Sequence, residues 1–482
     1  MNGAGPPRIA VVGAGISGLT AAYRLRTLLG PTAQIMLVEG SQRLGGALRT
    51  VELAGLPLDV GAEAFLMRRP EAVRLIEELG LGGQLVHPSG AVPTVRAGGR
   101  TVALPTRTLL GLPGTTADVA GVLSAQGTKR VAAEPTVPLC WEPGQDAVVG
   151  MLLRERAGDE LVDRLVDPLL GGVYAGRADA LGLRATLPAV ATALDRGAGS
   201  LLAAAADALP PRASLGGARS PVFGTLRGGL SGLVDALVAA AAVRPRLGLP
   251  VRGLIRIAEG WRLALGSAAR PEYLDIDAVL LAVPAPALRR LLADPLPAAS
   301  AAAGRVEVAS SAVVGLALPL AAAQTLPETS GVLVAASERL SVKAFTFSGR
   351  KWAHASSPEV LLMRASLGRH GEARMLQCDD AQLVDAVRAD LAALTGITVA
   401  PVATVVARWG GGLPQYAPGH LNAVAALERE VARSAGLAIA GATLHGVGLP
   451  AGIATADAAA RRICGYLASR QAAAARGGTM GS

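Results

Sequence analysis

The feature that most constrains the fold of this chain is an apolar strand that runs through three glycines into a helix. Residues 9–12 read as a buried strand, the glycines have the G-x-G-x-x-G spacing, and residues 19–28 carry apolar side chains at helical spacing. Such glycines permit a tight turn, close approach of the backbone to a pyrophosphate, and close packing of helix and strand. The helix N-terminus favours a phosphate. We therefore predict dinucleotide binding by Gly13, Ala14, Gly15, Ile16, Ser17 and Gly18.

A second apolar strand supports this prediction, because the glycine motif alone also occurs in turns that bind no ligand. The segment "QIMLVE", residues 34–39, ends in the carboxylate of Glu39, about 20 residues beyond Gly18. A ribose 2′-OH would be bound at this point. The acid suits FAD or NAD and argues against a ligand with a 2′-phosphate.

The composition describes a globular chain with a basic balance. Of its 482 residues, 51% are hydrophobic and 17% are charged, which is not a disordered composition. The net charge is +9, and all but three of the 46 cationic residues are arginines. Arginine suits carboxylates and phosphates, although a GC-rich genome explains the bias equally well. The cations are scattered and not interleaved with aromatic residues, so we do not expect nucleic-acid binding.

Neither a disulfide framework nor a metal site is expected. Cys140, Cys378 and Cys464 lie far apart, which fits a reducing cytoplasm, and the five histidines lack ligand spacing. We expect no signal peptide before the first strand. Residues 308–327 contain no charge and are long enough to suggest a membrane span. Pro319, the serines and the absence of flanking positive charge instead favour a buried strand and turn, so no transmembrane span is predicted.

Strand and helix patterns predict an α/β protein in which the two chain ends meet. Residues 8–65 read as strand, helix, strand and glycine turn, and residues 436–467 again read as strand, glycine-rich turn and helix. Two such turns suggest one domain built from both ends. Between them we expect helices over residues 70–208, interrupted by loops at 88–118 and 135–145, strands at 251–257, 261–265, 278–283 and within 305–366, a helix at 381–394 and a strand at 399–408.

Three ordered motifs resemble a known family. They are "RLGGALRT" at residues 43–50, "DVGAEAFL" at residues 59–66 and the glycine-rich turn at residues 441–448. Together they resemble the FAD-dependent amine oxidase and porphyrinogen oxidase superfamily. Within it, residues 167–176, 221–237, 278–288 and 413–420 resemble the protoporphyrinogen and coproporphyrinogen oxidases of haem biosynthesis. The resemblance covers residues 8–467 and is strongest to the Gram-positive, actinobacterial branch, which oxidises coproporphyrinogen III.

The resemblance implies an FAD-binding Rossmann-like domain built from both chain ends, a mixed α+β substrate domain and a helical insert. The implied FAD-binding ranges are 8–70, 209–300 and 409–470. The helical insert would span 71–208, the substrate-binding sheet 301–408 and a tail 471–482.

The resemblance also implies roles for individual residues in FAD binding. The pyrophosphate would lie on residues 13–18 and the adenosine ribose on Glu39, while the backbone of Val251 would meet the adenine. Glu63 replaces an arginine that some protoporphyrinogen oxidases have at this point, which puts a propionate contact there in doubt. The remaining FAD contacts would be Arg43, Gly45, Gly46, Gly61, Ala62, Glu63, Ala64, Trp409, Val447, Gly448 and Leu449.

The implied reaction is the six-electron oxidation of a porphyrinogen to a porphyrin in three two-electron rounds, with O2 reduced to hydrogen peroxide. The flavin supplies this chemistry, so no catalytic acid or base is named. An apolar slot with arginines would recognise the rings and propionates. The candidate substrate contacts are Arg68, Arg69, Gly172, Val173, Tyr174 and Phe345, followed by the weaker candidates Phe347, Lys343, Arg364 and Arg369.

Several alternatives stay open. Protoporphyrinogen IX is the alternative substrate. A flavin amine oxidase is less favoured, because its aromatic cage is hard to build from thirteen aromatic residues and no cysteine lies beside the 441–449 turn. A flavin-free escort or lipid-binding protein of the same fold is argued against by the intact glycine segments. The family suggests a cytoplasmic enzyme, with transient ferrochelatase contact and peripheral contact at the inner face of the membrane left open.

Overall fold

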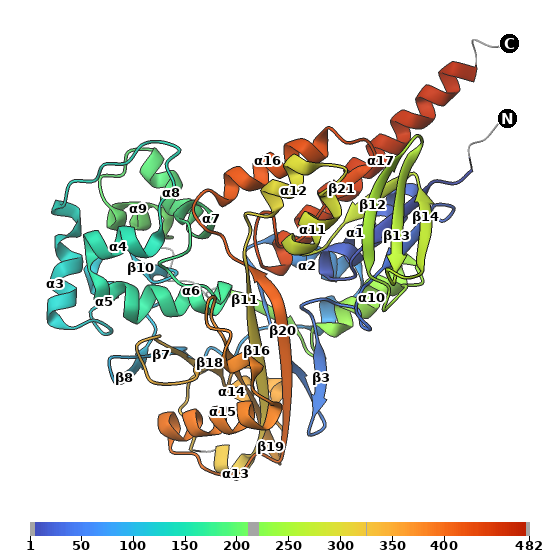
Figure 1. Ribbon diagram of the computed structural model, residues 1–482. Helices are drawn as coiled ribbons and strands as arrows, with labels where there is room; N and C mark the ends of the chain where they lie inside the picture. Colours follow the sequence, from blue (N-terminus) through green and yellow to red (C-terminus); the bar gives the residue numbers. More distant parts are fainter. Residues whose placement is uncertain (1–4, 211–220, 324, 479–482) are drawn as a thin grey trace.

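A four-stranded parallel sheet brings both ends of the chain together (Figure 1). The structure is a computed structural model that describes residues 5–210, 221–323 and 325–478. The strands lie in the order β2, β1, β15, β21, so two N-terminal strands join one strand from the middle of the chain and one from near its end. Their bounds are β1 Arg8–Val12, β2 Gln34–Val38, β15 Ala278–Leu281 and β21 Leu437–Ile439. The predicted α/β fold built from both chain ends is confirmed.

Both faces of this sheet are covered, as uninterrupted apolar strands require. On β1, Ile9 and Val11 join the core on one face, and Ala10 and Val12 join the core on the other. The first face is covered by α1 Ile16–Leu29, α2 Pro70–Glu78, α10 Ser231–Ala241 and α17 Leu449–Gly478. The second is covered by β12 Val251–Ile257, β13 Gly260–Gly266, β14 Pro271–Ile276, α11 Ala285–Leu292, α12 Pro297–Ala303 and α16 His420–Ala432.

A seven-stranded sheet forms a second lobe, at the bottom of Figure 1. Its order is β20 Ala403–Pro414, β16 Val308–Pro319, β19 Val360–Leu367, β18 Val342–Thr346, β17 Gly331–Val334, β7 Thr94–Ala97 and β8 Arg100–Ala103. Helix α15 (Asp380–Thr395) packs Leu383, Val387 and Leu391 against this sheet. Because β16 contains most of the uncharged segment 308–327, the predicted buried strand there is confirmed.

Helices form the third lobe, at the left of Figure 1, around a core of their own. They are α3 Ala125–Ala133, α4 Val149–Ala157, α5 Asp159–Leu161, α6 Asp167–Tyr174, α7 Leu183–Thr186, α8 Pro188–Asp195 and α9 Leu201–Ala208. Short strands complete the fold: β3 Thr50–Leu53 with β4 Leu56–Asp59, β5 Phe65–Leu66 and β6 Leu85–Val86 with β11 Phe223–Leu226, and β9 Thr108–Leu109 with β10 Leu112–Pro113. Between β18 and β19 lies the one-turn helix α14, Ser348–Lys351.

The hairpin of β7 and β8 occupies a region for which the sequence analysis predicted a loop. Gly98 and Gly99 have φ angles of +59° and +73°, the left-handed conformation of a two-residue hairpin turn, for which Gly-Gly is a favoured sequence. The loop prediction was wrong because the two glycines were taken to exclude strands, whereas they form the turn between two strands. Strand β7 pairs in parallel with β17, so this hairpin extends the seven-stranded sheet. The division of the chain into domain ranges stays a prediction.

Strand β20 and helix α17 extend well beyond their predicted bounds. Strand β20 begins at Ala403 and continues to Pro414, where a strand over 399–408 was predicted, because it pairs along nearly the whole of β16. The pairing register shifts between Ala309 and Ser311 on β16. Helix α17 continues through residues 471–478, which belong to the predicted tail. Residues 479–482 of that tail lie outside the described residues.

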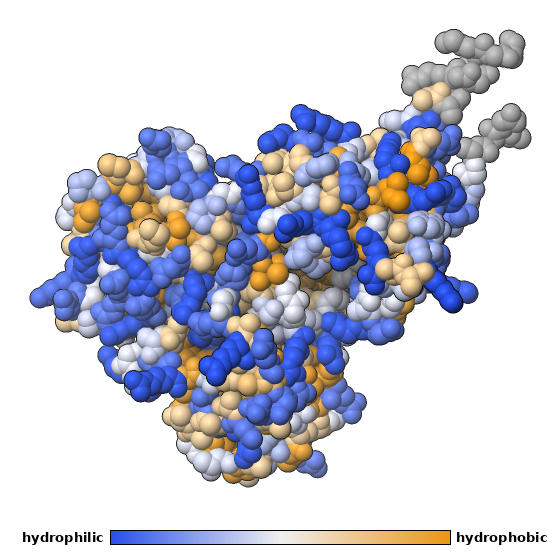
Figure 2. Space-filling model, viewed as in Figure 1, coloured by the Kyte–Doolittle hydropathy of each residue, from blue (hydrophilic) through white to orange (hydrophobic). Residues whose placement is uncertain are grey.

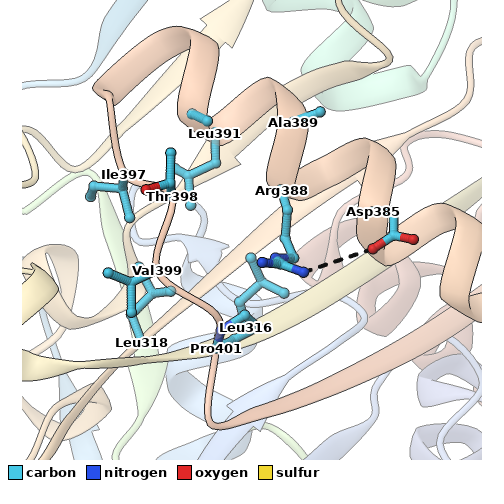
Figure 3. Close-up of a pocket in the computed structure, with 11 residues that line it drawn as sticks. Leu316, Leu318, Asp385, Arg388, Ala389, Leu391, Ile397, Thr398, Val399 and Pro401 are labelled. Atoms are coloured by element: carbon cyan, nitrogen blue, oxygen red, sulfur yellow. Dashed lines mark ion pairs between the residues drawn. The ribbon is translucent and has the colours of Figure 1, made fainter.

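The surface in view is mixed in character. Figure 2 shows hydrophilic residues over most of this face, with hydrophobic residues in separate groups between them. Among the described residues, no helix combines the length and the hydrophobicity that crossing a bilayer requires. A cavity of about 260 Å³ lies between α15, β16 and residues 397–401 (Figure 3). None of the predicted site residues lines it.

Candidate functional site

The glycine-rich turn leaves β1 for α1 under tight steric limits. Gly13 has a φ of +97°, and a Cβ there would lie 2.4 Å from the carbonyl oxygen of Ala282. A Cβ on Gly18 would lie 1.8 Å from the carbonyl oxygen of Gly13. Gly15 differs, because the nearest atom to its added Cβ is the Gly46 Cα at 3.7 Å. Gly13 and Gly18 are therefore required by the packing of the turn itself, whereas the fold leaves room at Gly15.

A second glycine pair lies directly against this turn. The Gly45 N–H donates to the Ala14 carbonyl at 2.8 Å, and a parallel bridge joins Gly15 to Gly45. A Cβ on Gly46 would lie 2.9 Å from the Gly15 Cα. The two glycine segments thus form a groove of bare backbone that side chains would fill, and such a groove suits a diphosphate.

Two helix N-termini meet beside this groove. Helix α1 begins after Gly15 with no side-chain cap and no acidic residue in its first turn, so its first N–H groups are available to an anion. Helix α17 begins at Leu449, and a Cβ on Gly452 would lie 2.9 Å from the Ser17 hydroxyl. The structure therefore brings the turn at residues 447–449 next to the turn at residues 13–18, as the predicted site requires.

The carboxylate of Glu39 lies at the end of β2, where the sequence predicted it. It accepts the Ala14 N–H at 2.7 Å and the Ser41 N–H at 2.8 Å. The Leu249 N–H donates to the Glu39 backbone carbonyl at 2.9 Å, which places the start of β12 nearby. There the Val251 carbonyl accepts from Arg290 at 3.1 Å. The end of β2 at Glu39 is thus joined to the segment that leads into β12 at Val251.

The loop of residues 59–63, hereafter the 59–63 loop, is held from two sides. On one side the Val60 and Ala62 N–H groups donate to the Arg49 and Ala47 carbonyls, both at 2.9 Å. On the other, the Trp409 indole N–H donates to the Val60 carbonyl at 2.9 Å. A Cβ on Gly61 would lie 2.0 Å from the Ala47 oxygen, so this position also requires glycine.

Arg43 connects the second glycine pair to Trp409. Its guanidinium lies 5.0 Å from the centre of the Trp409 ring, a cation–π distance. It also donates to the backbone carbonyls of Leu44, Leu48 and Gly46 at 3.1, 3.3 and 2.6 Å. In this structure Arg43 therefore holds the 43–48 segment in shape and stacks on Trp409.

Glu63 is the charged centre of this region. Its side chain is 8% exposed and accepts from Lys351 Nζ at 2.8 Å and from Arg364 Nη2 at 3.4 Å. Burial opposes its charge, but Arg364 and Lys351 outweigh burial and lower the pKa of the carboxyl to about 2. Sequence analysis missed Lys351. Its only signal is that it is one of three lysines among 46 cations.

A second buried carboxyl group, that of Asp59, has a raised pKa. Burial raises the pKa of Asp59 to about 6, against the opposing hydrogen bonds from the Thr50 hydroxyl at 2.6 Å and the Leu230 N–H at 3.1 Å. Because the folded-state pKa exceeds the ordinary 3.8, the protonated form is favoured in the folded chain. The resulting stability is present below about pH 4 and is lost as the pH rises through 6.

We expect Asp59→Asn to stabilise the chain above pH 6 by about 2 to 3 kcal/mol, because the amide has no charge to desolvate and keeps an acceptor for Thr50 and Leu230. Urea unfolding at pH 4 and pH 8 measures this effect. The advantage over wild type should vanish at pH 4. A variant that is less stable at both pH values would contradict the assignment.

The candidate substrate residues divide into two groups. Tyr174 is buried, with its ring 5.5 Å from the Tyr416 ring, and Tyr416 stacks on His420 at 3.9 Å. The Tyr416 hydroxyl donates to the Ala442 carbonyl, within the C-terminal glycine-rich turn at residues 441–448. Val173 is 40% exposed beside Tyr174. The structure thus links residues 172–174 to the predicted flavin turn through Tyr416 and His420, two residues not predicted individually.

The other candidates lie elsewhere. Phe345 is 2% exposed in the core shared by β18 and α15, where it stacks on Phe347, so its side chain offers no free surface. Arg68 is exposed, and Arg69 pairs with Glu71 at 2.9 Å and lines a cavity of about 350 Å³ beside α16 and α17.

The three weaker cationic candidates, Lys343, Arg364 and Arg369, all donate to backbone carbonyls. Lys343 donates to the Gly368 carbonyl at 2.9 Å, and burial with the nearby charge of Arg369 lowers its pKa to about 8. Arg369 donates to the Val334 carbonyl at 3.0 Å. Their part in binding a substrate stays a prediction.

Comparison with known proteins decides the family. The family model described as flavin containing amine oxidoreductase matches residues 16–464. The chain belongs to this family. It is an oxidoreductase whose cofactor is FAD. The groove of bare backbone, the uncapped α1 N-terminus and the Glu39 carboxylate fit such a dinucleotide.

Curated relatives extend over nearly the whole chain. Coproporphyrinogen III oxidase from Mycobacterium tuberculosis (strain ATCC 25618 / H37Rv) is 44% identical over 94% of this chain and 96% of its own length. The Bacillus subtilis protein of the same name is 30% identical over 96% of this chain and 99% of its own. Protoporphyrinogen oxidase from Macaca fascicularis is 32% identical over 64% of this chain and 66% of its own.

Solved structures agree on the fold. A putative protoporphyrinogen oxidase from Exiguobacterium has a TM-score of 0.83 at 30% identity, covering 96% of this chain and 99% of its own. Cyclohexylamine oxidase from Brevibacterium oxydans has a TM-score of 0.67 at 17% identity, covering 96% of this chain and 99% of its own. The second likeness concerns the fold alone.

Proposed function

We propose that this chain uses FAD and O2 to oxidise coproporphyrinogen III to coproporphyrin III, with release of hydrogen peroxide, in haem b biosynthesis. The observation that supports this most is the 44% identity to mycobacterial coproporphyrinogen III oxidases, which extends over 94% of the chain. The relatives at 30% and 32% identity from Bacillus subtilis and Propionibacterium freudenreichii carry the same name.

We assign FAD to the groove described above. The pyrophosphate would lie on residues 13–18, the ribose on Glu39 and the adenine beside Val251. Gly45, Gly46 and Arg43 would follow the cofactor, and residues 61–64, Trp409 and the 447–449 turn would surround its ring. When bound, FAD accepts two electrons in each round, so a six-electron oxidation needs three rounds.

The protein's own residues would bind and orient rather than exchange protons. The α1 N-terminus and the bare glycine backbone support the diphosphate charge. Trp409 and the carbonyl contacts of Arg43 fix the segments on either side of the ring position. Glu63 is ionised and paired with two cations, so it is a poor general acid. We therefore name no catalytic acid or base.

We place the substrate beside residues 172–174, with Arg68 or Arg69 as candidate propionate contacts. The partial exposure of Val173 and the link from Tyr174 to the C-terminal turn support this placement. The four propionates of coproporphyrinogen III would favour a more basic pocket than the two of protoporphyrinogen IX. We also propose a cytoplasmic enzyme that passes its porphyrin to a ferrochelatase by transient contact. Peripheral attachment at the inner face of the membrane is an open part of this proposal.

Protoporphyrinogen IX oxidation is the second candidate, favoured by the names of the Macaca and Exiguobacterium proteins. The visible spectrum of the purified protein and its O2 consumption with each porphyrinogen separate the two. We expect a flavin spectrum and a kcat/KM at least about tenfold higher for coproporphyrinogen III, because this substrate carries two more propionates for a basic pocket to attract.

Every other outcome would change the assignment of the substrate or of the FAD site. Preference for protoporphyrinogen IX would overturn the substrate and keep the chemistry. A bound flavin that reacts with neither porphyrinogen would favour an amine as substrate. A protein that binds no FAD at all would contradict the assignment of the glycine groove.

A further inference from the structure

One arginine of the seven-stranded sheet reaches the backbone of the 59–63 loop. Arg364 lies on β19, and its Nη1 donates to the carbonyls of Asp59 and Gly61, both at 2.8 Å. Its Nη2 reaches Glu63 Oε2 at 3.4 Å. Only 17% of the side chain is exposed. A single guanidinium therefore holds three consecutive odd-numbered residues of this loop.

The chemistry of these contacts calls for arginine. A guanidinium is planar and always charged, and it presents several N–H donors in fixed directions, whereas a lysine amine is a point charge on a flexible stem. The carbonyl oxygens of Asp59 and Gly61, both partly buried, accept from the same Nη1, whose two N–H groups point in fixed directions. Charge-assisted hydrogen bonds to them are stronger than neutral ones. The same group also balances the Glu63 carboxylate at the end of the loop.

The loop lies between two parts of the fold that Arg364 connects. Its N–H groups are bound to the 47–49 backbone, which follows the second glycine pair. Its carbonyls are bound by Arg364 and Trp409, from β19 and β20 of the seven-stranded sheet. The N–H groups of the loop therefore attach it to backbone that directly follows the glycine pair assigned to the cofactor, and its carbonyls attach it to the sheet assigned to the substrate.

We infer that Arg364 positions the 59–63 loop against FAD and thereby couples the seven-stranded sheet to the flavin. This inference rests on the proposed placement of FAD beside residues 61–64. Arg364 is a positioning residue: it acts through the loop carbonyls.

A competing explanation is that Arg364 only neutralises Glu63, and Lys351 provides a matched control. Lys351 Nζ donates to the same Glu63 oxygen at 2.8 Å, and its side chain is similarly buried, with 19% exposed against 17% for Arg364. Within the part of the chain that the structure describes, Lys351 Nζ makes no hydrogen bond to a carbonyl of the 59–63 loop. Arg364→Met and Lys351→Met therefore remove the same charge from the same carboxylate, and only the first frees the loop.

The test measures FAD binding and the properties of the bound flavin rather than catalytic turnover. Apoprotein of wild type, R364M, R364K and K351M is titrated with FAD by flavin fluorescence, and the visible spectrum and midpoint potential of each holoprotein are recorded. We expect R364M to raise the FAD Kd about tenfold or more and to shift both spectrum and potential. K351M should stay within about twofold of wild type, because the contact it removes is to the Glu63 carboxylate and not to a loop carbonyl. R364K should fall between them, because it keeps the charge but loses the fork.

The outcomes that overturn the inference are distinct from failure of the proposed function. Equal effects of R364M and K351M would mean that Arg364 only balances the charge of Glu63. An unchanged Kd, spectrum and potential in R364M would exclude positioning. If R364M does not fold, as judged by circular dichroism, wild-type behaviour of R364K would exclude it. None of these measurements uses a porphyrinogen, so an incorrect substrate assignment would leave them intact.

Discussion

Gly15→Val should abolish FAD binding while leaving the chain folded. In the folded chain Gly15 has an ordinary extended conformation, with φ −75° and ψ 179°, and its Cβ would meet only the Gly46 Cα at 3.7 Å. The polypeptide therefore tolerates a side chain there. The side chain would instead fill the backbone groove in which we place the pyrophosphate. We expect the FAD Kd to rise at least about 100-fold, or about 2.7 kcal/mol, and oxidase activity to fall with it.

The measurement is FAD content after gel filtration together with thermal unfolding of the apoprotein. Gly18→Ala is the contrasting variant, since its Cβ would lie 1.8 Å from the Gly13 carbonyl oxygen and must disturb the turn itself. We expect G18A to lower the apoprotein Tm and G15V to leave it nearly unchanged. A G15V protein that purifies with a full complement of FAD would show that the pyrophosphate lies elsewhere.

Glu63→Ala should lower the free energy of unfolding at neutral pH by about 3 to 5 kcal/mol, because it leaves two partly buried cations without their carboxylate. The carboxyl is 8% exposed, and its pKa in the folded chain is about 2, below the ordinary 4.5. A lowered folded-state pKa means that the stability it contributes is present above pH 4.5 and is lost as the pH falls toward 2. The difference between wild type and E63A should therefore narrow in acid.

Urea unfolding from pH 7 to pH 3 measures both the size and the pH dependence of this effect. Glu63→Gln is the companion variant, because it keeps the shape and the hydrogen-bond acceptor while removing the charge. We expect E63Q to lose less stability than E63A. Because neither variant has an ionisable group at position 63, the stability difference between wild type and each variant should narrow as the pH falls below 4.5. A loss under about 1 kcal/mol for E63A at pH 7 would mean that Lys351 and Arg364 find other partners or water.

Local signals in the sequence predicted the nucleotide-binding half of the molecule well. The strand at residues 9–12, the helix after Gly15 and the strand ending at Glu39 follow from apolar periodicity and glycine spacing, and the structure has them as β1, α1 and β2. The same holds for β12, whose predicted bounds of 251–257 agree with the structure. These elements are predictable because the residues that specify each of them are neighbours in the chain.

The elements that were predicted wrongly depend on distant partners. The extent of β20 follows from its pairing with β16, about 90 residues earlier in the chain. The β7–β8 hairpin has only a short alternating pattern, and it is extended into a sheet by β17, more than 200 residues later. Strand length and strand order are set by hydrogen-bonding partners, which a local pattern does not record.

The sequence by itself determined the family, the cofactor class and the glycines that line the groove, because those signals are motifs of fixed spacing. Only the tertiary structure decided how charge is arranged around the 59–63 loop. Glu63 lies 288 residues before Lys351 and 301 residues before Arg364, and no motif joins it to them. Folding buries them together, so that the charges of Arg364 and Lys351 lower the pKa of Glu63 against its burial, whereas burial raises the pKa of Asp59. Long-range burial and charge pairing are properties of the folded arrangement. The cluster of Glu63, Lys351 and Arg364 therefore forms only when the seven-stranded sheet packs against the nucleotide-binding half.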